Sequence, residues 1–160
     1  MLRRLQDHPH ALETLYDLTR RLLRPFRRWL ERGGAVERVF IRVEQASKGA
    51  LFNCQMCGEC VLHSTGMTCP MNCPKNLRNG PCGGVRINGH CEVIPGMRCV
   101  WVEAYDRSQH MTRYGRDMRR VVPPLDRQFQ GTSAWINEFV GVAGQPPAAW
   151  TSPDEAGGPT

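Results

Sequence analysis

Apolar side chains recur every three or four positions between residues 8 and 32, which is the spacing of one face of an α-helix. Pro25 lies inside this pattern, so we expect the helix to kink or end there and to restart with Pro25 in its first turn. Gly33 and Gly34 then end it. The apolar positions are Leu12, Leu15, Leu18, Leu22, Leu23, Phe26 and Leu30.

A second apolar pattern with helical spacing covers residues 36–46, with Val36, Val39, Phe40, Val43 and Ala46 as its apolar positions. Gly49 is placed to cap the end of this helix. Its β-branched residues leave a strand as the alternative. We expect both helices to pack against a core or a partner, and nothing in them indicates catalysis.

The chain after residue 100 contains two further patterns. Residues 101–120 could form an arginine-rich helix, which Pro123 and Pro124 would end. Residues 125–140 contain a small apolar cluster that could close over the core or anchor the chain to another subunit. Its members are Phe129, Trp135, Ile136 and Phe139. From Gly144 onward the composition is that of a disordered tail.

Residues 51–100 have no such periodicity and contain all eight cysteines, together with seven glycines. Such a segment cannot bury enough apolar surface to fold alone, so metal coordination would supply the missing free energy. We therefore expect a mainly α fold with an irregular, loop-rich cysteine and metal core and little β structure. The predicted organisation is N-terminal helices at 1–50, the metal-binding core at 51–100, a C-terminal helix and closing segment at 101–143, and a disordered tail at 144–160.

Composition narrows the setting of these cysteines. No apolar run approaches the roughly 18 residues that cross a bilayer, and no apolar segment follows the first charged residues as in a secretory signal. We therefore expect a cytoplasmic protein without membrane contact, in which thiols stay reduced and bind metal.

The net charge is +6, and Lys48 and Lys75 are the only lysines. This arginine excess suits docking on an acidic protein surface or holding a phosphorylated ligand, or simply solvated faces.

The spacing of the cysteines is typical of iron–sulfur proteins. Three cysteines at intervals of three, followed by a cysteine before proline, are the elements of ferredoxin-type cubane sites. The predicted ligands are Cys54, Cys57, Cys60, Cys69, Cys73, Cys82, Cys91 and Cys99. Eight thiolates suffice for two [4Fe-4S] clusters, which we favour, but they would equally fill one [4Fe-4S] cluster and one zinc site, or two zinc sites.

Other residues in this segment support the cysteines. His63 and His90 could replace a thiolate, but with eight cysteines present we expect them to lie in loops or to hydrogen-bond to a ligand. Asn79-Gly80-Pro81-Cys82-Gly83-Gly84 predicts a tight turn whose backbone N–H groups could bond to cluster sulfurs. The lysine and serine of a Walker motif are absent from the sequence, so we set aside a phosphate-binding loop.

Six short motifs together resemble one known family, the methylenetetrahydrofolate reductase C-terminal, cysteine-rich domain. They are Cys54-Gln-Met-Cys57-Gly-Glu-Cys60, Thr68-Cys69-Pro70, Cys73-Pro74-Lys75, Asn79-Gly80-Pro81-Cys82-Gly83-Gly84, Gly89-His90-Cys91-Glu92 and Cys99-Val100-Trp101. The resemblance covers roughly residues 36–140, and Ser133-Ala134-Trp135-Ile136-Asn137 also looks like this family.

In this family the domain is fused behind a TIM-barrel flavin reductase or made as a separate iron–sulfur subunit beside it. The chain has no barrel, so the resemblance implies a small, non-catalytic subunit that partners a barrel-type flavin methylenetetrahydrofolate reductase in one-carbon metabolism. It would pass electrons to that reductase or stabilise it. The alternatives are a purely structural zinc-binding subunit of the same complex and, less favoured, a nucleic-acid-binding zinc module suggested by the pI of about 9.1.

Overall fold

The computed structural model describes residues 2–30, 34–146 and 150–151. Its α-helices are α1 (Pro9–Leu23), α2 (Arg27–Leu30), α3 (Ala35–Phe52), α4 (Val100–Ser108) and α5 (Ala134–Val140). Short 3₁₀ helices connect them: η1 (Leu2–Asp7), η2 (Arg24–Phe26), η3 (Leu62–Ser64), η4 (Pro70–Asn72), η5 (Gly115–Arg119) and η6 (Arg127–Phe129). In the described part of the chain, β structure is limited to an isolated bridge between His90 and Arg98. The predicted mainly α fold is confirmed.

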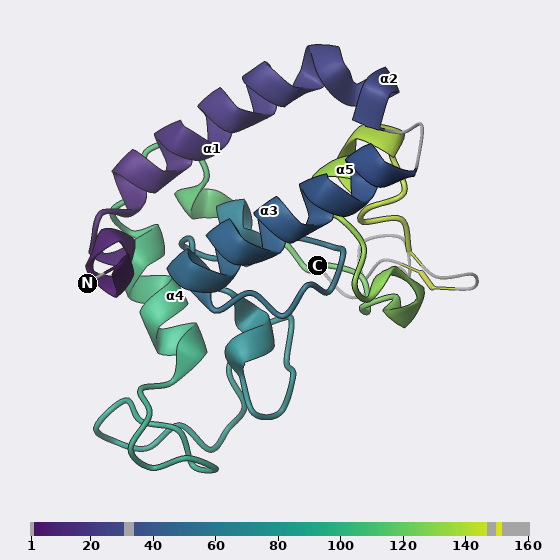
Figure 1. The fold of residues 1–160 in the computed structure, drawn as a ribbon. Helices are drawn as coiled ribbons and strands as arrows, with labels where there is room; N and C mark the ends of the chain where they lie inside the picture. Colours follow the sequence, from purple (N-terminus) through teal and green to yellow (C-terminus); the bar gives the residue numbers. More distant parts are fainter. Residues whose placement is uncertain (1, 31–33, 147–149, 152–160) are drawn as a thin grey trace.

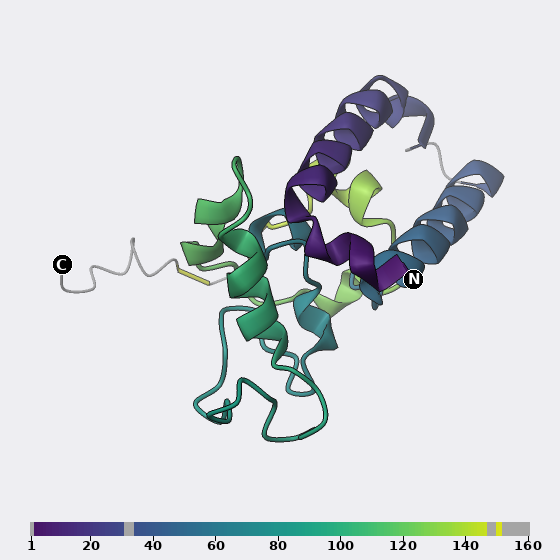
Figure 2. The same ribbon diagram turned by 90° about the vertical axis from the view of Figure 1, so that its left-hand side faces the viewer.

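The two long helices, α1 and α3, form one side of the molecule, and the cysteine-rich loops lie on the other (Figures 1 and 2). The loops that lead into α4 project furthest from α1 and α3. At the start of the chain, η1 packs against α3, where Gln6 Nε2 donates to the carbonyl of Leu51. None of the helices described is both long and apolar enough to cross a bilayer.

The helices near the N-terminus follow the predicted pattern, with one difference. The first helix is interrupted at Pro25, where η2 separates α1 from α2, as predicted. The second helix does not end at Gly49 but continues to Phe52, so the predicted cap is wrong. Asn53 ends it instead, with φ of 52°, because an asparagine tolerates the left-handed conformation that a C-terminal cap requires. Gly33 lies outside the described residues.

The predicted helix at 101–120 is also shorter than expected, because α4 ends at Ser108. The backbone N–H groups of Thr112, Arg113 and Tyr114 are all hydrogen-bonded to the carboxylate of Glu13 in α1. They are therefore not available to continue a helical ladder. The predicted tail from residue 144 falls largely outside the described residues.

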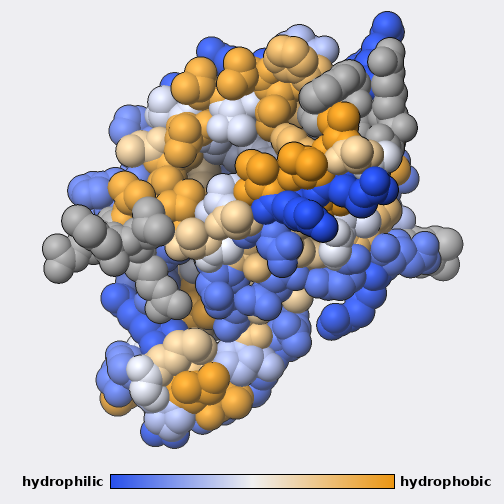
Figure 3. Space-filling view, viewed as in Figure 1, coloured by the Kyte–Doolittle hydropathy of each residue, from blue (hydrophilic) through white to orange (hydrophobic). Residues whose placement is uncertain are grey.

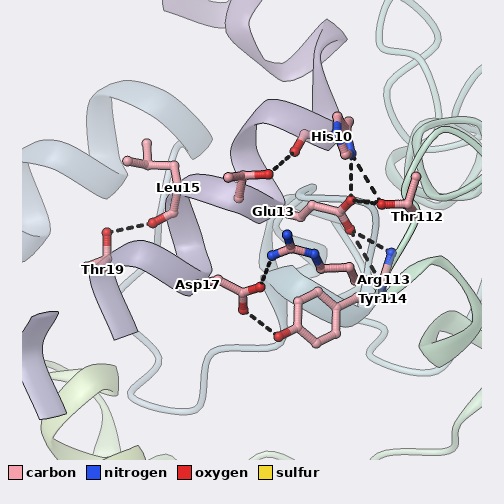
Figure 4. A network of polar contacts seen from close by, with 9 residues as sticks. His10, Glu13, Leu15, Asp17, Thr19, Thr112, Arg113 and Tyr114 are labelled. Atoms are coloured by element: carbon pink, nitrogen blue, oxygen red, sulfur yellow. Dashed lines mark hydrogen bonds and ion pairs between the residues drawn. The ribbon is translucent and has the colours of Figure 1, made fainter. Parts of the chain in front are cut away.

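The Glu13 carboxylate joins α1 to the segment after α4 (Figure 4). Its side chain is fully buried, and Oε1 accepts from both the backbone N–H and the hydroxyl of Thr112, at 3.0 and 2.8 Å. Oε2 accepts from the backbone N–H of Arg113 at 3.1 Å. One turn further along α1, Asp17 accepts from Arg113 and, at 2.5 Å, from the hydroxyl of Tyr114. The N-terminal helix is thus held by two adjacent carboxylates.

The apolar core is divided into two small clusters, and each contains cysteine. The first joins α1 and α3 to the loops through Leu12, Phe52, Leu62, Met67, Cys69 and Met111. The second lies at the start of α4 and consists of Cys99, Trp101 and Ala104. In the predicted cluster at 125–140, Trp135 and Ile136 are buried in α5. The cysteine loops are thus bracketed by small cores and not by a single large one.

Candidate metal centres

The eight cysteines divide into two sets of four, each lining its own cavity. The first site is lined by Cys54, Cys57, Cys60 and Cys69, around a cavity of about 20 Å³. The second site is lined by Cys73, Cys82, Cys91 and Cys99, around a cavity of about 10 Å³. All eight thiols are free of disulfides. Among the residues described, no three His, Cys, Asp or Glu side chains come together closely enough to hold one metal ion.

The loop of the first site depends on two residues with positive φ. Met56 has φ of 48° and Gly58 has φ of 78°, so the chain reverses between its first three cysteines. A Cβ on Gly58 would lie 2.3 Å from the carbonyl oxygen of Phe129, which excludes any other side chain at that position. The backbone N–H of Met56 donates to Cys54 Sγ at 3.4 Å. The local fold therefore turns thiols inward and supplies a donor to one of them.

Three thiols of the first site, those of Cys54, Cys57 and Cys69, favour their neutral form when no metal is bound. Burial raises the pKa of Cys69 to about 12 and raises the pKa of both Cys54 and Cys57 above the usual range. A cation bound among them would reverse this effect, because metal ligands bind as thiolates.

A buried ion pair borders the first site. Lys48 Nζ donates to Glu44 Oε1 at 2.6 Å, and Ser133 Oγ donates to Glu44 Oε2 at 2.5 Å. The same Lys48 Nζ lies 5.0 Å from the centre of the Trp135 ring. Burial opposes its charge, but the negative charges of Cys60 and Glu44 raise the pKa of Lys48 to about 12. Lys48 is therefore a fixed positive charge beside the sulfurs.

A second cation reaches the same cavity. Arg78 lines it, and its Nε is buried without a hydrogen-bond partner among the described residues. Its Nη1 donates to the carbonyl of Glu59 at 3.3 Å, while the Glu59 carboxylate accepts from the backbone N–H of Asp126 at 2.9 Å. A buried guanidinium N–H that lacks an acceptor is compatible with an acceptor, such as a negatively charged group, in this cavity.

The second site lies closer to solvent. Cys82 Sγ lies 3.5 Å from Glu92 Oε1, and the same carboxylate pairs with Lys75. Glu92 also occupies the space beside Gly84, where a Cβ would lie 1.8 Å from its Oε2. The bridge between His90 and Arg98 brings the strand-like segments that carry Cys91 and Cys99 together.

The predicted ligands thus line two cavities in sets of four, whereas the two histidines line neither cavity. His63 stacks on Tyr16 with ring centres 5.3 Å apart, and His90 Nδ1 lies 2.8 Å from the carbonyl of Pro95. Lys48, Arg78 and Glu44 also border the first cavity, but the sequence pattern did not predict them as site residues. One feature of the sequence could have pointed to Lys48. The chain has only two lysines, and each lies at a cysteine site: Lys48 lines the first cavity and Lys75 the second.

Both sites have the donors for a cluster or for zinc, but their cavities differ. A zinc ion lies about 2.3 Å from each of four thiolates, which leaves no water-sized space among the sulfurs. A cavity needs about 10–15 Å³ to hold a water molecule. The first cavity, at about 20 Å³, exceeds this limit, so it leaves more space among its sulfurs than a single ion needs. The second, at about 10 Å³, lies at the lower end of this limit, so a zinc ion fits there more readily than at the first site.

We expect Lys48→Met to destabilise the protein by about 3–5 kcal/mol, because it leaves the Glu44 carboxylate buried without its cation. Urea unfolding of the metal-loaded protein measures this loss. Lys75→Met is the matched control, since Lys75 also pairs with a glutamate beside a cysteine site but lies at the surface. The control should change the free energy of unfolding far less. Equal losses in the two variants would contradict the structural role of the buried pair.

Comparison with known proteins supports the family indicated by the cysteine motifs. No curated protein and no solved structure matches the chain. Residues 34–128, which are more than half of the chain, match the family described as methylene-tetrahydrofolate reductase C terminal. The match begins at the start of α3 and includes all eight cysteines. It ends before α5, and α1 precedes it, so both of these helices lie outside the match. The chain belongs to the methylene-tetrahydrofolate reductase C-terminal family.

Proposed function

We propose that the protein is a non-catalytic iron–sulfur subunit that partners a flavin-dependent methylenetetrahydrofolate reductase in the cytoplasm. One observation carries the proposal: the eight cysteines form two complete sets of four, each around its own cavity. Four thiolates are the ligand set of a [4Fe-4S] cluster. The family match supplies the link to the reductase.

The residues of this chain would bind the clusters and set their surroundings. Cys54, Cys57, Cys60 and Cys69 would hold one, and Cys73, Cys82, Cys91 and Cys99 the other. When bound, such clusters supply one-electron transfer from an external one-electron carrier to the partner's flavin, where two electrons and two protons give the dihydroflavin. Lys48 and Arg78 would face the first cluster with positive charge, which offsets the negative charge of four thiolates. The chain itself offers no flavin chemistry in this proposal.

The proposal is tested by the metal content of anaerobically purified protein together with its visible spectrum before and after dithionite. Two clusters predict about eight iron and eight sulfide per chain and a broad absorbance that bleaches on reduction. The reduced protein should then reduce the flavin of the reductase subunit. Loaded clusters that never exchange electrons with that flavin would contradict the electron-transfer role.

A structural role for metal is the second candidate, and the smaller second cavity favours it at that site. Zinc at the second site predicts about four iron, four sulfide and one zinc per chain. Zinc at both sites, without iron, would replace the electron-transfer role by a structural one. In that case chelation should unfold the subunit while the reductase alone keeps its flavin chemistry.

A further inference from the structure

A groove between α1 and α3 leads from the surface to the first cysteine site. It encloses about 300 Å³ and is lined mainly by apolar side chains of these two helices. Leu15 of α1 and Val43 of α3 line it while remaining more than half exposed to solvent. Apolar side chains gather along both helices in the space-filling view (Figure 3). In the described part of the chain nothing covers this face.

The floor of the groove is formed by residues of the first site. Cys60 and Lys48 line both the groove and the first cavity, whereas Cys54, Cys57 and Cys69 line the cavity alone. Tyr16 and Trp135 stack beside them with ring centres 5.1 Å apart. A protein seated in the groove would therefore approach the first site at Cys60, the one cysteine that lines both spaces.

A basic surface lies beside the groove, on a neighbouring face of α1. There a polar hollow of about 480 Å³ is lined by Arg20, Arg21, Arg24 and Arg27 together with the carboxylates of Asp17 and Glu138. Arg20 pairs with Glu138 at 2.7 Å, whereas the other three form no ion pair within the described part of the chain. Arginines that are not neutralised attract carboxylates and reject a basic surface. The occupant of the groove is therefore expected to carry acidic residues beside its apolar ones.

We propose that this groove is the docking surface for the reductase subunit, and that it receives an apolar segment of that subunit flanked by Asp or Glu side chains. The inference rests on the proposed function, which supplies the partner, and adds where it binds and which ligand faces it. It assigns a role to α1, which lies outside the family match. It also accounts for apolar side chains left exposed on two helices that otherwise serve the core.

The test measures the affinity of the metal-loaded chain for the purified reductase subunit by titration calorimetry. Val43→Glu and Leu15→Glu place a carboxylate in the groove, where it meets both the apolar segment and its acidic flanks. Each should weaken binding at least tenfold. Val121→Glu is the matched control, since Val121 is as exposed as Val43 but lies outside the groove, and it should leave the affinity within about twofold. Unchanged metal content and circular dichroism would show that the variants fold.

The contribution of the arginines to binding is tested separately, by a charge-reversal variant and by salt. Arg24→Glu should weaken binding, and added potassium chloride should weaken the wild-type complex because salt screens exposed charges. If Val43→Glu and Leu15→Glu bind the reductase subunit with the same affinity as Val121→Glu, the groove is not the docking site. That result would leave the proposed function unaffected. A wild-type dimer that Val43→Glu dissociates would assign the groove to a second copy and overturn the inference. Failure of the wild-type chain to bind the reductase at all would overturn both proposals.

Discussion

Replacing Cys57 by serine is expected to empty the first site and leave the second one loaded. Each cavity is lined by its own four cysteines, so loss of one thiolate breaks one set only. If both sites hold clusters, iron and sulfide should fall from about eight to about four per chain. Reduction of the partner's flavin should be lost, because Cys60 connects the first site to the docking groove. Iron analysis and flavin absorbance measure the two effects.

The matched variant is Cys91→Ser, which removes a thiolate of the second set. It should also halve the iron, and the double variant should remove nearly all of it. Circular dichroism is needed beside the metal analysis, since the binding free energy of a metal also stabilises the fold. A Cys57→Ser protein that remains folded and loses the metal of both sites would contradict the division into two independent sets.

Replacing Glu13 by glutamine is expected to lower the free energy of unfolding by about 3 kcal/mol. The amide presents one acceptor oxygen and an NH₂ group to a site where both carboxylate oxygens accept, so the N–H of either Thr112 or Arg113 loses its partner. A buried donor left unsatisfied costs about 1–3 kcal/mol, and hydrogen bonds to a charged acceptor are stronger than neutral ones. Urea unfolding measures the loss. Glu37→Gln, in the first turn of α3, is the control and should have a small effect.

The same carboxylate predicts how stability depends on pH. Burial opposes its charge, but hydrogen bonds from Thr112, His10 and Arg113 lower the pKa of Glu13 from 4.5 to about 2. A carboxyl group whose pKa is lower in the folded state stabilises that state above the unfolded pKa. This contribution is therefore full above about pH 5 and is lost as the pH falls from 4.5 toward 2. In the Glu13→Gln variant, the free energy of unfolding should therefore fall less steeply between pH 4.5 and 2 than in the wild-type protein. An unchanged pH profile would contradict the assignment.

The sequence predicted the helices and the fold class because both depend on local periodicity. The apolar repeats of α1 and α3 and the break at Pro25 are visible in the chain itself. The end of α4 is not, because it depends on Glu13, about one hundred positions earlier, binding the backbone of Thr112 and its neighbours. The predicted cap at Gly49 also came from local sequence, because glycine often ends a helix. The prediction failed because Asn53, four residues later, adopts the positive φ that ends α3.

The site was predicted to a similar degree. The cysteine spacing identified the eight candidate ligands but could not assign them to sites. Cys69 and Cys73 are both followed by proline, yet Cys69 lines the first cavity and Cys73 the second. Lys48 could not be identified as a neighbour of the first site either, since helical periodicity does not show that α3 places it against Cys60. The assignment of each cysteine to a site, and the charges beside that site, depend on the tertiary fold and not on local spacing.

The placement of Cys69 and Cys73 on either side of η4 has a consequence for how the two sites take up charge. Only Pro70, Met71 and Asn72 separate them, in a 3₁₀ turn that rises about 2 Å per residue. Their α-carbons are therefore roughly 8–13 Å apart. At about 10 Å and an effective dielectric of 20, one unit of added charge at one site opposes the next at the other by roughly 1.7 kcal/mol. If both sites hold clusters, their charges would therefore repel, and the second electron would be harder to add than the first.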